Sequence, residues 1–587
     1  MLSDPAADQP PLRMGVMCSG TTFEAWQARC IEDLLALGFV KPTVLIADAS
    51  EAPPRPRGLG KLKAAITSRR TAWNLYHRLF VRSASRASRP VDLSESLTGV
   101  PVLRCRPERR GRFACELAPS DIETLRDHRL DFILRFAFGI IKGEVLTLPR
   151  YGVWSFHHDD LDVYRGPPAC FWPLYENDPI QGVTLQRLTE GIDNGIVLHT
   201  GHFNAVRHSY VRNRDAAFMG AAHFPAKVCR DIRAGNHSRV LSAPSPTRAP
   251  VRTVPGNGQT LVFAMKMAKR KAGNVLASLF RHTQWNVGMV DAPIAAFLKS
   301  PTPARTDWLP VGRRGSFVAD PFGIERAGRT VVLAETFDDR EGVGRIGALD
   351  WSGPARSPST VLSRPFHLSY PFLLEHEDEI YCIPEMYENR RVELHRALEF
   401  PTRWELAATL VSDVAAIDPT LVRWDGRWWL FAATKDRYTE IRLMAWHAPD
   451  LRGPFTPHAC NPLKCDVRSS RPAGTPFVHE GRLYRPAQDC SRSYGGAVAI
   501  NRVVTLTPTA FEETVETVVR ADPRSPFPDG LHTISAVGPR TLIDGKRTVF
   551  LPREFLAQLR RMLRIPTSAA ASAGATLPSG SPAGARS

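Results

Sequence analysis

The stretch from Tyr151 to Leu198 contains the densest group of side chains that could carry out chemistry. Its sequence is YGVWSFHHDDLDVYRGPPACFWPLYENDPIQGVTLQRLTEGIDNGIVL. His157 and His158 follow an apolar run, and Asp193 lies in a later acidic turn. Imidazole changes its charge near neutral pH, so a histidine oriented by a carboxylate can move protons to and from a reacting group. The pattern therefore indicates a candidate site for acid–base chemistry.

Four short motifs in this stretch, SFH, YRG, GVT and IDNG, follow one another at compatible separations. Their order resembles the formyltransferase family, which includes methionyl-tRNA formyltransferase, glycinamide ribonucleotide formyltransferase and the sugar N-formyltransferases. The resemblance is strong over residues 125–200, extends to residues 13–48 and is not detectable beyond residue 235. It implies a Rossmann-like α/β domain that uses 10-formyltetrahydrofolate as its formyl donor.

The resemblance also assigns catalytic roles. Formyl transfer to an amine passes through a tetrahedral intermediate with an oxyanion, while the attacking nitrogen loses a proton. By the position of the motif, His157 would take that proton and Asp193 would orient its ring. Ser155 stands where the family has an asparagine that helps to hold the formyl oxygen, and a serine hydroxyl has only one proton to donate. Either Ser155 or His158 compensates, or the domain binds its ligands without turnover.

Folate binding is implied by the same resemblance. The segment FAFGII corresponds to the part of the family that holds the pterin, and an Arg-Gly pair would shape the loop beside the transferred group. The residues are Phe138, Gly139, Ile140, Ile141, Arg165 and Gly166. Taken alone, FAFGII has the pattern of a core strand, so its cofactor role depends on the neighbouring motif.

Strand and helix patterns alternate around these motifs. Over residues 13–48 the pattern is strand, helix and strand, and DFILRFAFGII is typical of a buried strand. Such alternation favours a mostly parallel sheet. We therefore expect residues 1–232 to form an α/β catalytic domain with a basic insertion at about 52–91.

A change of composition near Ala234 predicts a domain boundary. Residues 233–258 are rich in Pro, Ser, Gly and Arg and predict a linker. Residues 259–305 predict a helical connector whose basic amphipathic pattern fits either packing against protein or weak contact with a membrane surface. Residues 553–587 predict a short helix and a low-complexity tail.

Residues 306–552 predict an all-β domain with an internal repeat. Turn signals recur at intervals of 50, 48, 55 and 64 residues, and prolines fall in register in ADPF, SYPF and IDPT. The turns lie around Gly328, Asp378, Gly426, Gly481 and Gly545. Five units of this kind predict a five-bladed β-propeller, with a β-sandwich of irregular hairpins as the alternative.

Acidic residues stand at the edges of the predicted strands, namely Asp320, Glu385, Asp418 and Asp489. Propeller strands converge on a central channel, so these acids could face one cavity. Two carboxylates there could cleave a glycosidic bond, while sugar binding or a structural role are the alternatives. The pattern loosely resembles family 43 glycoside hydrolases and the β-domain of plant glucosamine inositolphosphorylceramide transferases.

Charge and cysteine usage narrow the class of protein. The formal net charge is +17, and ten Lys or Arg between Arg55 and Arg89 occur without an acid. Such a segment attracts phosphates, nucleic acid or an anionic membrane, or is a solvated insertion.

Ten cysteines without a CxxC pair predict neither a disulfide framework nor a metal site. The N-terminus lacks the pattern of a signal peptide, so a cytoplasmic location is expected.

These observations predict a folate-dependent N-formyltransferase that acts on the amine of a nucleotide-linked amino sugar in glycan biosynthesis. One alternative is an activity like that of methionyl-tRNA formyltransferase, which the positive charge suggests. That family carries a small C-terminal barrel in place of the long repeat found here, so no specific nucleic acid is expected. Another alternative is a glycan-binding or glycosidase propeller joined to a silent formyltransferase domain.

Overall fold

The computed structural model describes most of the chain. The described residues are 9–50, 68–111, 114–191, 194–242, 247, 249–303, 305–313, 315–353, 356–435 and 441–550. The expected C-terminal helix and tail at 553–587, and the first part of the basic insertion, lie outside them.

Seven strands form one sheet in the first half of the chain, in the order β12-β11-β10-β8-β1-β3-β5. The pairs β1–β3, β1–β8, β8–β10 and β3–β5 are parallel, and β11 and β12 join in antiparallel fashion. The predicted α/β class and mostly parallel sheet are therefore confirmed. The sheet strands are β1 Leu12–Cys18, β3 Val40–Asp48, β5 Val102–Cys105, β8 Phe132–Arg135, β10 Val153–His157, β11 Ile180–Arg187 and β12 Ile196–Asn204.

Helices cover both faces of this sheet because its strands alternate between two apolar cores. On β8, Phe132 packs in the core under α1, while Ile133 packs in the core under α4. The helices are α1 Ala25–Leu35, α3 Thr71–Tyr76, α4 Pro119–Asp127, α5 Trp172–Glu176, α6 Tyr210–Gly220, α7 Phe224–Arg233 and α8 Ser238–Leu241, with helical turns η1 His77–Val81 and η2 Glu144–Leu146. Short strands are β2 Thr22–Glu24, β4 Pro90–Asp92, β6 Glu108–Arg110, β7 Ala114–Glu116 and β9 Ile140–Ile141.

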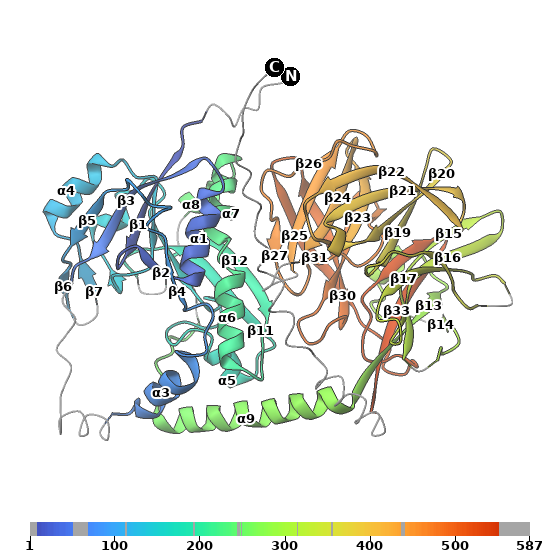
Figure 1. Ribbon diagram of the computed structural model, residues 1–587, viewed down its shortest axis with the longest axis horizontal. Helices are drawn as coiled ribbons and strands as arrows, with labels where there is room; N and C mark the ends of the chain where they lie inside the picture. Colours follow the sequence, from blue (N-terminus) through green and yellow to red (C-terminus); the bar gives the residue numbers. More distant parts are fainter. Residues whose placement is uncertain are drawn as a thin grey trace, which may run out of the picture.

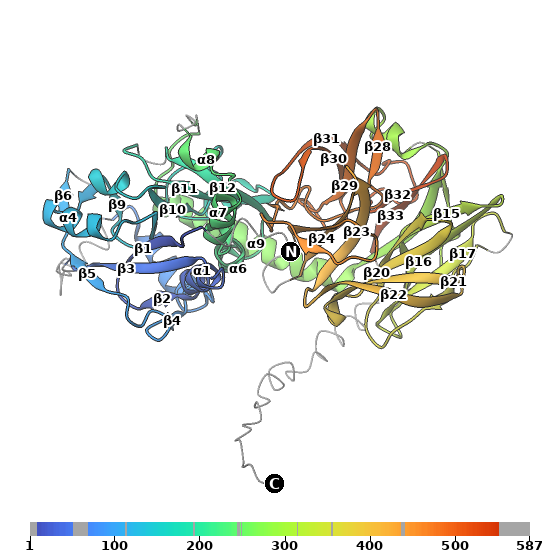
Figure 2. The ribbon, with the colours of Figure 1, turned by 90° about the horizontal axis from the view of Figure 1, so that it is seen from above.

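A long helix, α9 Asn257–Phe280, connects the two halves and runs along the lower edge of the molecule in Figure 1. The second half consists of antiparallel sheets beside the α/β sheet, as Figure 2 shows from above. Its first strands are β13 Arg281–Val290, β14 Thr306–Trp308, β15 Ser316–Arg326, β16 Arg329–Asp338, β17 Gly344–Asp350, β18 Ser359–Leu362, β19 Ser369–His376, β20 Glu379–Glu385, β21 Arg391–Glu399 and β22 Arg403–Ser412. The remaining strands are β23 Ala416–Trp424, β24 Arg427–Thr434, β25 Arg442–Ala448, β26 Thr456–Pro457, β27 Lys464–Cys465, β28 Phe477–His479, β29 Arg482–Asp489, β30 Ala497–Leu506, β31 Phe511–Val519, β32 Ile534–Val537 and β33 Arg540–Phe550; two helical turns are η3 Ile294–Leu298 and η4 Tyr387–Asn389.

The described residues of the second half form five separate antiparallel sheets. Four of them use consecutive strands, which are β15–β18, β19–β22, β23–β27 and β28–β31. The remaining sheet, in the order β14-β13-β33-β32, combines strands from the two ends of this half. The arrangement is propeller-like, and the expected all-β character is confirmed.

The predicted repeat is correct for four of its five turns. The turns at Gly328, Asp378, Gly426 and Gly481 each join the first two strands of a sheet and have positive φ. Gly545 instead lies inside β33, where it pairs with Asn286. A side chain at Gly545 would lie within 2.3 Å of the Trp308 ring, so the glycine serves close packing. The fifth turn lies between β32 and β33.

The domain boundaries also differ from expectation. Helix α9 ends at Phe280, and the alternating residues that follow form strand β13, which pairs with β33 along its length. The described residues of the range 281–305, expected as part of a helical connector, thus belong to the propeller-like half. The segment expected as a linker contacts the first half, since Val251 pairs with Arg165.

Polar contacts join the two halves beside strand β12. His202 Nε2 lies 3.1 Å from Asp160 Oδ2 and its Nδ1 lies 3.5 Å from Asp466 Oδ2 in the second half. The Asn204 amide donates to the carbonyl oxygens of Cys490 and Ser491. His202 therefore lies between one carboxylate from each half.

A buried ion pair links strands β29 and β31, which lie on either side of β30. Arg485 donates to both carboxylate oxygens of Glu513 at 2.7 and 3.0 Å, and to the carbonyl oxygens of Ser469 and Ser470. Lys464 Nζ lies 3.0 Å from Glu513. The donors of Arg485 therefore have partners in spite of burial.

Among the described helices, none combines the length and apolar character needed to cross a bilayer.

His202 should make stability depend on pH. Burial alone would lower its pKa, but hydrogen bonds to Asp160 and Asp466 outweigh burial and raise the pKa from 6.5 to about 8. The stabilisation is therefore full below pH 6.5 and is lost as pH rises through about 8. His202→Gln should flatten a dependence of about 2 kcal/mol in the free energy of unfolding, measured by urea titration. His479→Gln on exposed β28 should retain the dependence, and a pH slope unchanged by His202→Gln would contradict the assignment.

Arg485→Ala should lower the free energy of unfolding by about 3–5 kcal/mol, because it leaves the Glu513 carboxylate buried with less compensation. Urea denaturation would measure the loss. Arg502→Ala on the same sheet is the matched control, since its pair with Glu516 at 3.3 Å is partly exposed and should contribute about 1 kcal/mol or less. Equal losses for the two variants would refute the difference.

Candidate functional site

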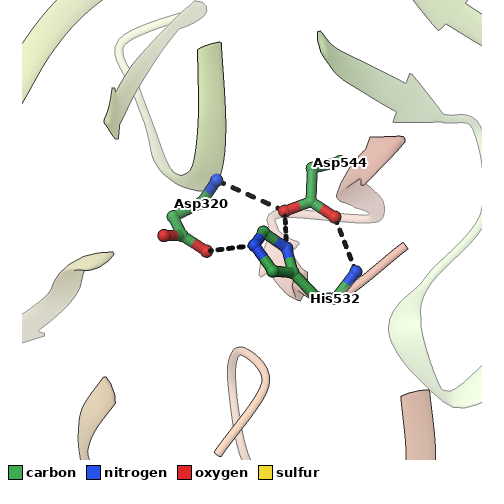
Figure 3. Close-up of side chains that lie close together, drawn as sticks. All are labelled: Asp320, His532 and Asp544. Carbon is green, nitrogen blue, oxygen red and sulfur yellow. Dashed lines mark hydrogen bonds and ion pairs between the residues drawn. The ribbon is translucent and has the colours of Figure 1, made fainter. Parts of the chain in front are cut away.

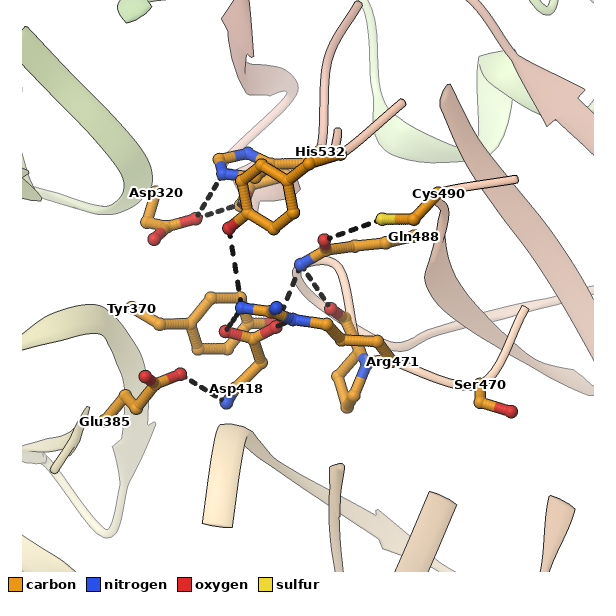
Figure 4. Close-up of polar contacts among 12 residues, drawn as sticks. Asp320, Tyr370, Glu385, Asp418, Ser470, Arg471, Gln488, Cys490 and His532 are labelled. Carbon is orange, nitrogen blue, oxygen red and sulfur yellow. Dashed lines mark hydrogen bonds and ion pairs between the residues drawn. The ribbon is translucent and has the colours of Figure 1, made fainter. Parts of the chain in front are cut away.

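Three consecutive sheets present a similar kink in their innermost strands. The ladders shift register just around Asp320 in β15, Tyr370 in β19 and Asp418 in β23. These residues have φ of 52°, 44° and 51°, and each precedes a proline. A bulge redirects a side chain out of the regular alternation. The three buried side chains take part in one polar cluster (Figure 4).

Asp418 is the central carboxylate of this cluster. Arg471 donates from Nε to Oδ2 and from Nη2 to Oδ1, and the Gln488 amide donates to Oδ2 at 2.8 Å. Arg471 comes from the segment before β28, and Gln488 comes from β29. Asp418 therefore joins the third sheet to the fourth.

Glu385, at the end of β20, joins the second sheet to the same carboxylate group. The backbone N–H of Asp418 donates to Glu385 Oε2 at 2.8 Å. Burial and the nearby Asp418 carboxylate raise the pKa of Glu385 well above its usual value. The raised pKa favours the protonated form of Glu385, in which the carboxyl group can donate a hydrogen bond.

Tyr370 connects the cluster to the segment before β28. Its hydroxyl lies 3.0 Å from Thr420 Oγ1 and accepts a hydrogen bond of 2.6 Å from the N–H of Gly474. Burial and Asp418 raise the pKa of Tyr370, so the phenol stays neutral. Gly474 is packed so closely on Ile534 that a side chain there would collide with its backbone.

Asp320, His532 and Asp544 form a buried group at the junction of the first and last sheets (Figure 3). His532 Nδ1 forms an ion pair with Asp544, and its Nε2 lies 3.8 Å from Asp320 Oδ1. Burial alone would lower the pKa of His532, but Asp544 and Asp320 raise it to about 9. Burial raises the pKa of Asp320 to about 7, although His532 opposes the change.

These three side chains have the donor types of a metal site, with ligand atoms within 4.8 Å of one another. The sequence predicted no metal. Asp544 accepts hydrogen bonds from the backbone N–H groups of Asp320, His532 and Thr533, and Asp320 accepts one from the Thr533 hydroxyl. The carboxylates are thus already engaged in a hydrogen-bonded group around His532.

Tyr494 lies where the cluster meets solvent. About 50% of its surface is exposed, while its hydroxyl lies 3.5 Å from Arg471 Nη2. Its ring packs edge-on against Trp285 and His532, which stack on each other at 4.0 Å. An aromatic surface therefore lies beside the acidic cluster.

Of the four strand-edge acids, Asp320, Glu385 and Asp418 lie in the buried cluster. Asp489 differs, because its carboxylate accepts a hydrogen bond from the N–H of Ser491. Among the described contacts, no hydrogen bond joins it to the other three acids. Since Gln488 precedes it on the strand and contacts Asp418, the alternation of β29 turns Asp489 away.

Sequence reasoning missed several members of the cluster, which are Tyr370, Arg471, Gln488, Tyr494, His532 and Asp544. The sequence contained a signal for two of these residues, namely the proline that follows each. Tyr370 stands before the proline of SYPF, and Arg471 stands before Pro472, 53 residues after Asp418. The residue before each repeated proline, rather than acidity, is the feature that these positions share.

The candidate residues of the first half lie at the end of β10. Ser155 is buried, and His157 Nε2 lies 2.9 Å from the carbonyl oxygen of Tyr164. His158 stacks on Phe218 at 3.5 Å, and burial lowers its pKa well below the usual value. His158 is thus a neutral member of the aromatic core. Asp193 lies outside the described residues.

Arg135 joins the segments that the resemblance assigned to catalysis and to folate. It donates to Ser155 Oγ at 2.8 Å and to the carbonyl oxygen of Gly139. Its side chain therefore contacts the position where the family has asparagine. Sequence reasoning gave Arg135 no role.

The other expected cofactor residues are spread over two environments. Phe138 and Ile141 are buried, whereas Ile140 is exposed. Arg165 donates to the carbonyl oxygen of Ala249, and Gly166 lies against the backbone of the segment around Arg252. The Arg-Gly pair thus contacts the chain that leads into α9.

The second half has a match among known families. Residues 292–525 match the family described as "Glucosamine inositolphosphorylceramide transferase 1, N-terminal". The protein of that name from Oryza sativa subsp. japonica is 36% identical over 210 residues, which cover 34% of this chain and 28% of the relative. The chain thus spans under a third of the length of such relatives.

Other likenesses involve shorter segments or distant structures. A methionyl-tRNA formyltransferase from Agathobacter rectalis is 39% identical over 77 residues, or 13% of this chain and 25% of the relative. A family 117 glycoside hydrolase from the marine bacterium Zobellia galactanivorans is 12% identical, with a TM-score of 0.31, and the alignment covers 46% of this chain and 91% of that one.

These findings correct the expected activity. The longer curated matches are named glucosamine inositolphosphorylceramide transferases, whereas the curated formyltransferases match over shorter segments. Folate-dependent N-formyl transfer and 10-formyltetrahydrofolate as donor were therefore wrong expectations. The motifs SFH, YRG, GVT and IDNG keep the order that resembles the formyltransferase family. At one of them the chain differs, because Ser155 stands where that family has asparagine, and Ser155 contacts Arg135. The chain combines a formyltransferase-like first part with a propeller-like second part.

Proposed function

We propose that this chain takes part in sugar transfer and that its second half binds an amino sugar at the cluster around Asp320, Glu385 and Asp418. The convergence of these buried acids is the observation that carries the proposal. All three lie within the segment 292–525 that matches the glucosamine inositolphosphorylceramide transferase family. Glucosamine is therefore the probe that the relatives suggest.

The chemistry of the cluster suits such a ligand. Sugar hydroxyl groups donate to carboxylates, and an amino sugar adds an ammonium group that carboxylates attract. Three carboxylates, those of Asp320, Asp418 and Asp544, lie with two cationic partners, Arg471 and His532. Since the raised pKa of Glu385 favours its protonated form, this carboxyl group could also donate to a sugar oxygen.

The aromatic surface supports the same ligand class. Binding sites for small molecules combine apolar rings with a few directed polar groups. Tyr494 presents its ring to solvent and directs its hydroxyl to Arg471, next to Asp418. A sugar ring packed on Tyr494 would place its polar groups toward the acids.

We also propose that the five sheets are blades of a closed propeller. The support is the pairing of β13 with β33 over ten residue pairs from Arg281–Phe550 to Val290–Thr541. This pairing joins the first and last strands of the second half, so each strand covers the edge that the other would leave unpaired. It also brings Asp544 and Asp320 together.

Asp320→Asn should weaken glucosamine binding about 10- to 100-fold, because losing a charged hydrogen-bond acceptor costs about 1.5–3 kcal/mol. Isothermal titration calorimetry would measure the change, with glucose as the ligand that lacks the ammonium group. Asp489→Asn is the matched control, since that carboxylate faces away, and its affinity should equal that of the unmodified chain. Thermal unfolding would verify that both variants are folded. Equal affinity for glucose and glucosamine, or no loss in Asp320→Asn, would refute the proposal.

A chain that ends at residue 531 should lose cooperative unfolding of the second half, because it leaves β13 without its long partner. Calorimetry would record the transition, and a chain that ends at residue 552 keeps both strands as the control. An unchanged transition in the shorter chain would show that the sheets do not depend on ring closure.

A further inference from the structure

Helix α9 has an apolar stripe on each of two opposite faces. Thr260, Phe263 and Met267 are buried and pack against the first half. At 100° per residue, the residues on the other side are Leu261, Met265, Ala268, Ala272, Leu276 and Leu279. These six residues, named here the outer stripe, repeat at intervals of three or four and run along five turns of the helix.

Five of the six residues of the outer stripe are exposed to solvent, and Leu279 is partly buried. Leu261 is 61% exposed, Met265 is 64% exposed and Leu276 is 57% exposed. Every residue from 271 to 276 is exposed, so this part of the helix has little cover from either half. Scattered apolar residues on a surface are ordinary, but a continuous stripe marks a site of interaction.

The charges beside the stripe are all positive. Lys269 and Lys271 are exposed and lie on either side of it on the helical wheel. Lys266 and Arg270 instead bind the first half, since they donate hydrogen bonds to the carbonyl oxygens of Tyr175 and Leu174. Helix α9 contains no Asp or Glu.

Helix α3 lies beside the start of α9 and is followed by the turn η1. The Asn257 side chain at the start of α9 accepts a hydrogen bond from the N–H of Ala72, and Tyr76 packs on Phe263. The apolar side chains Leu75, Leu79 and Phe80 are each more than half exposed. Neither α3 nor η1 contains an acid, and both lie with α9 at the lower edge in Figure 1.

The neighbouring helix α5 contains one acid, Glu176, which does not neutralise the positive charge of α9 because it has another partner. Glu176 pairs with Arg252 at 2.6 Å. The surface thus combines unpaired apolar area with cations on both sides, which is the composition of helices that lie in the headgroup region of a membrane. Anionic lipids add electrostatic attraction for such segments.

We propose that the outer stripe of α9, together with Leu75, Leu79 and Phe80, docks on a lipid bilayer that contains anionic headgroups. The outer stripe enters the interface between headgroups and acyl chains, while Lys269 and Lys271 contact the headgroups. This inference goes beyond the sugar site and does not depend on it, because the surface shares no residue with that cluster.

The test is flotation of the full chain with vesicles of phosphatidylcholine alone and with vesicles that also contain phosphatidylserine. The unmodified chain should float with the anionic vesicles and at least tenfold less with neutral ones. Met265→Glu combined with Leu276→Glu should abolish flotation, since it places carboxylates in the apolar stripe. Leu398→Glu combined with Leu406→Glu, at exposed apolar positions of the second half, is the matched control and should float normally.

Lys269→Glu combined with Lys271→Glu should lose the preference for anionic vesicles, while Lys299→Glu combined with Arg482→Glu, at exposed positions of the second half, should keep it. Circular dichroism would establish that all variants remain folded. Flotation that survives the α9 changes would overturn the proposal. A dimer of the lipid-free chain that Met265→Glu with Leu276→Glu dissociates would also overturn it, because the stripe would then be a contact between two copies.

Discussion

The buried contact between Asp418 and Arg471 determines how the sheets of the second half meet. Asp418 belongs to the third sheet, receives Arg471 and Gln488 from the fourth, and donates its own N–H to Glu385 from the second. Loss of one partner from a buried ion pair costs about 3–5 kcal/mol, because the other charge stays buried. A single carboxylate thereby fixes the relative positions of three sheets, and the aromatic residues around the cluster follow from that geometry.

Forming such a cluster costs folding free energy, and this cost indicates a role beyond packing. Asp320, Tyr370 and Asp418 all have positive φ, and a left-handed conformation costs about 1–3 kcal/mol for a residue other than glycine. An apolar core would avoid both this strain and the desolvation of the acids. Strain and buried charge in one place favour a site that serves binding over one that serves only packing.

The sequence predicts elements better than contacts. Alternating patterns were sufficient for the α/β sheet and for four of five hairpin turns, since each depends on local period and turn chemistry. Gly545 misled because its turn-like neighbours lie inside a strand, where Trp308 requires a glycine. Two acids of the site, Asp320 and Asp418, could be found from the repeated prolines, and Glu385 from its place at the edge of a predicted strand. His532 and Asp544 lie over 200 residues from Asp320, and no local pattern indicates that the first and last sheets meet.

The same limit explains the error about formyl transfer. A motif records which residues follow one another, whereas activity depends on what occupies the space that they surround. In this chain Arg135, which belongs to no motif, reaches both Ser155 and the carbonyl oxygen of Gly139. The order of the motifs can remain when the site has changed, because it also encodes the strand and turns on which the first half depends for folding.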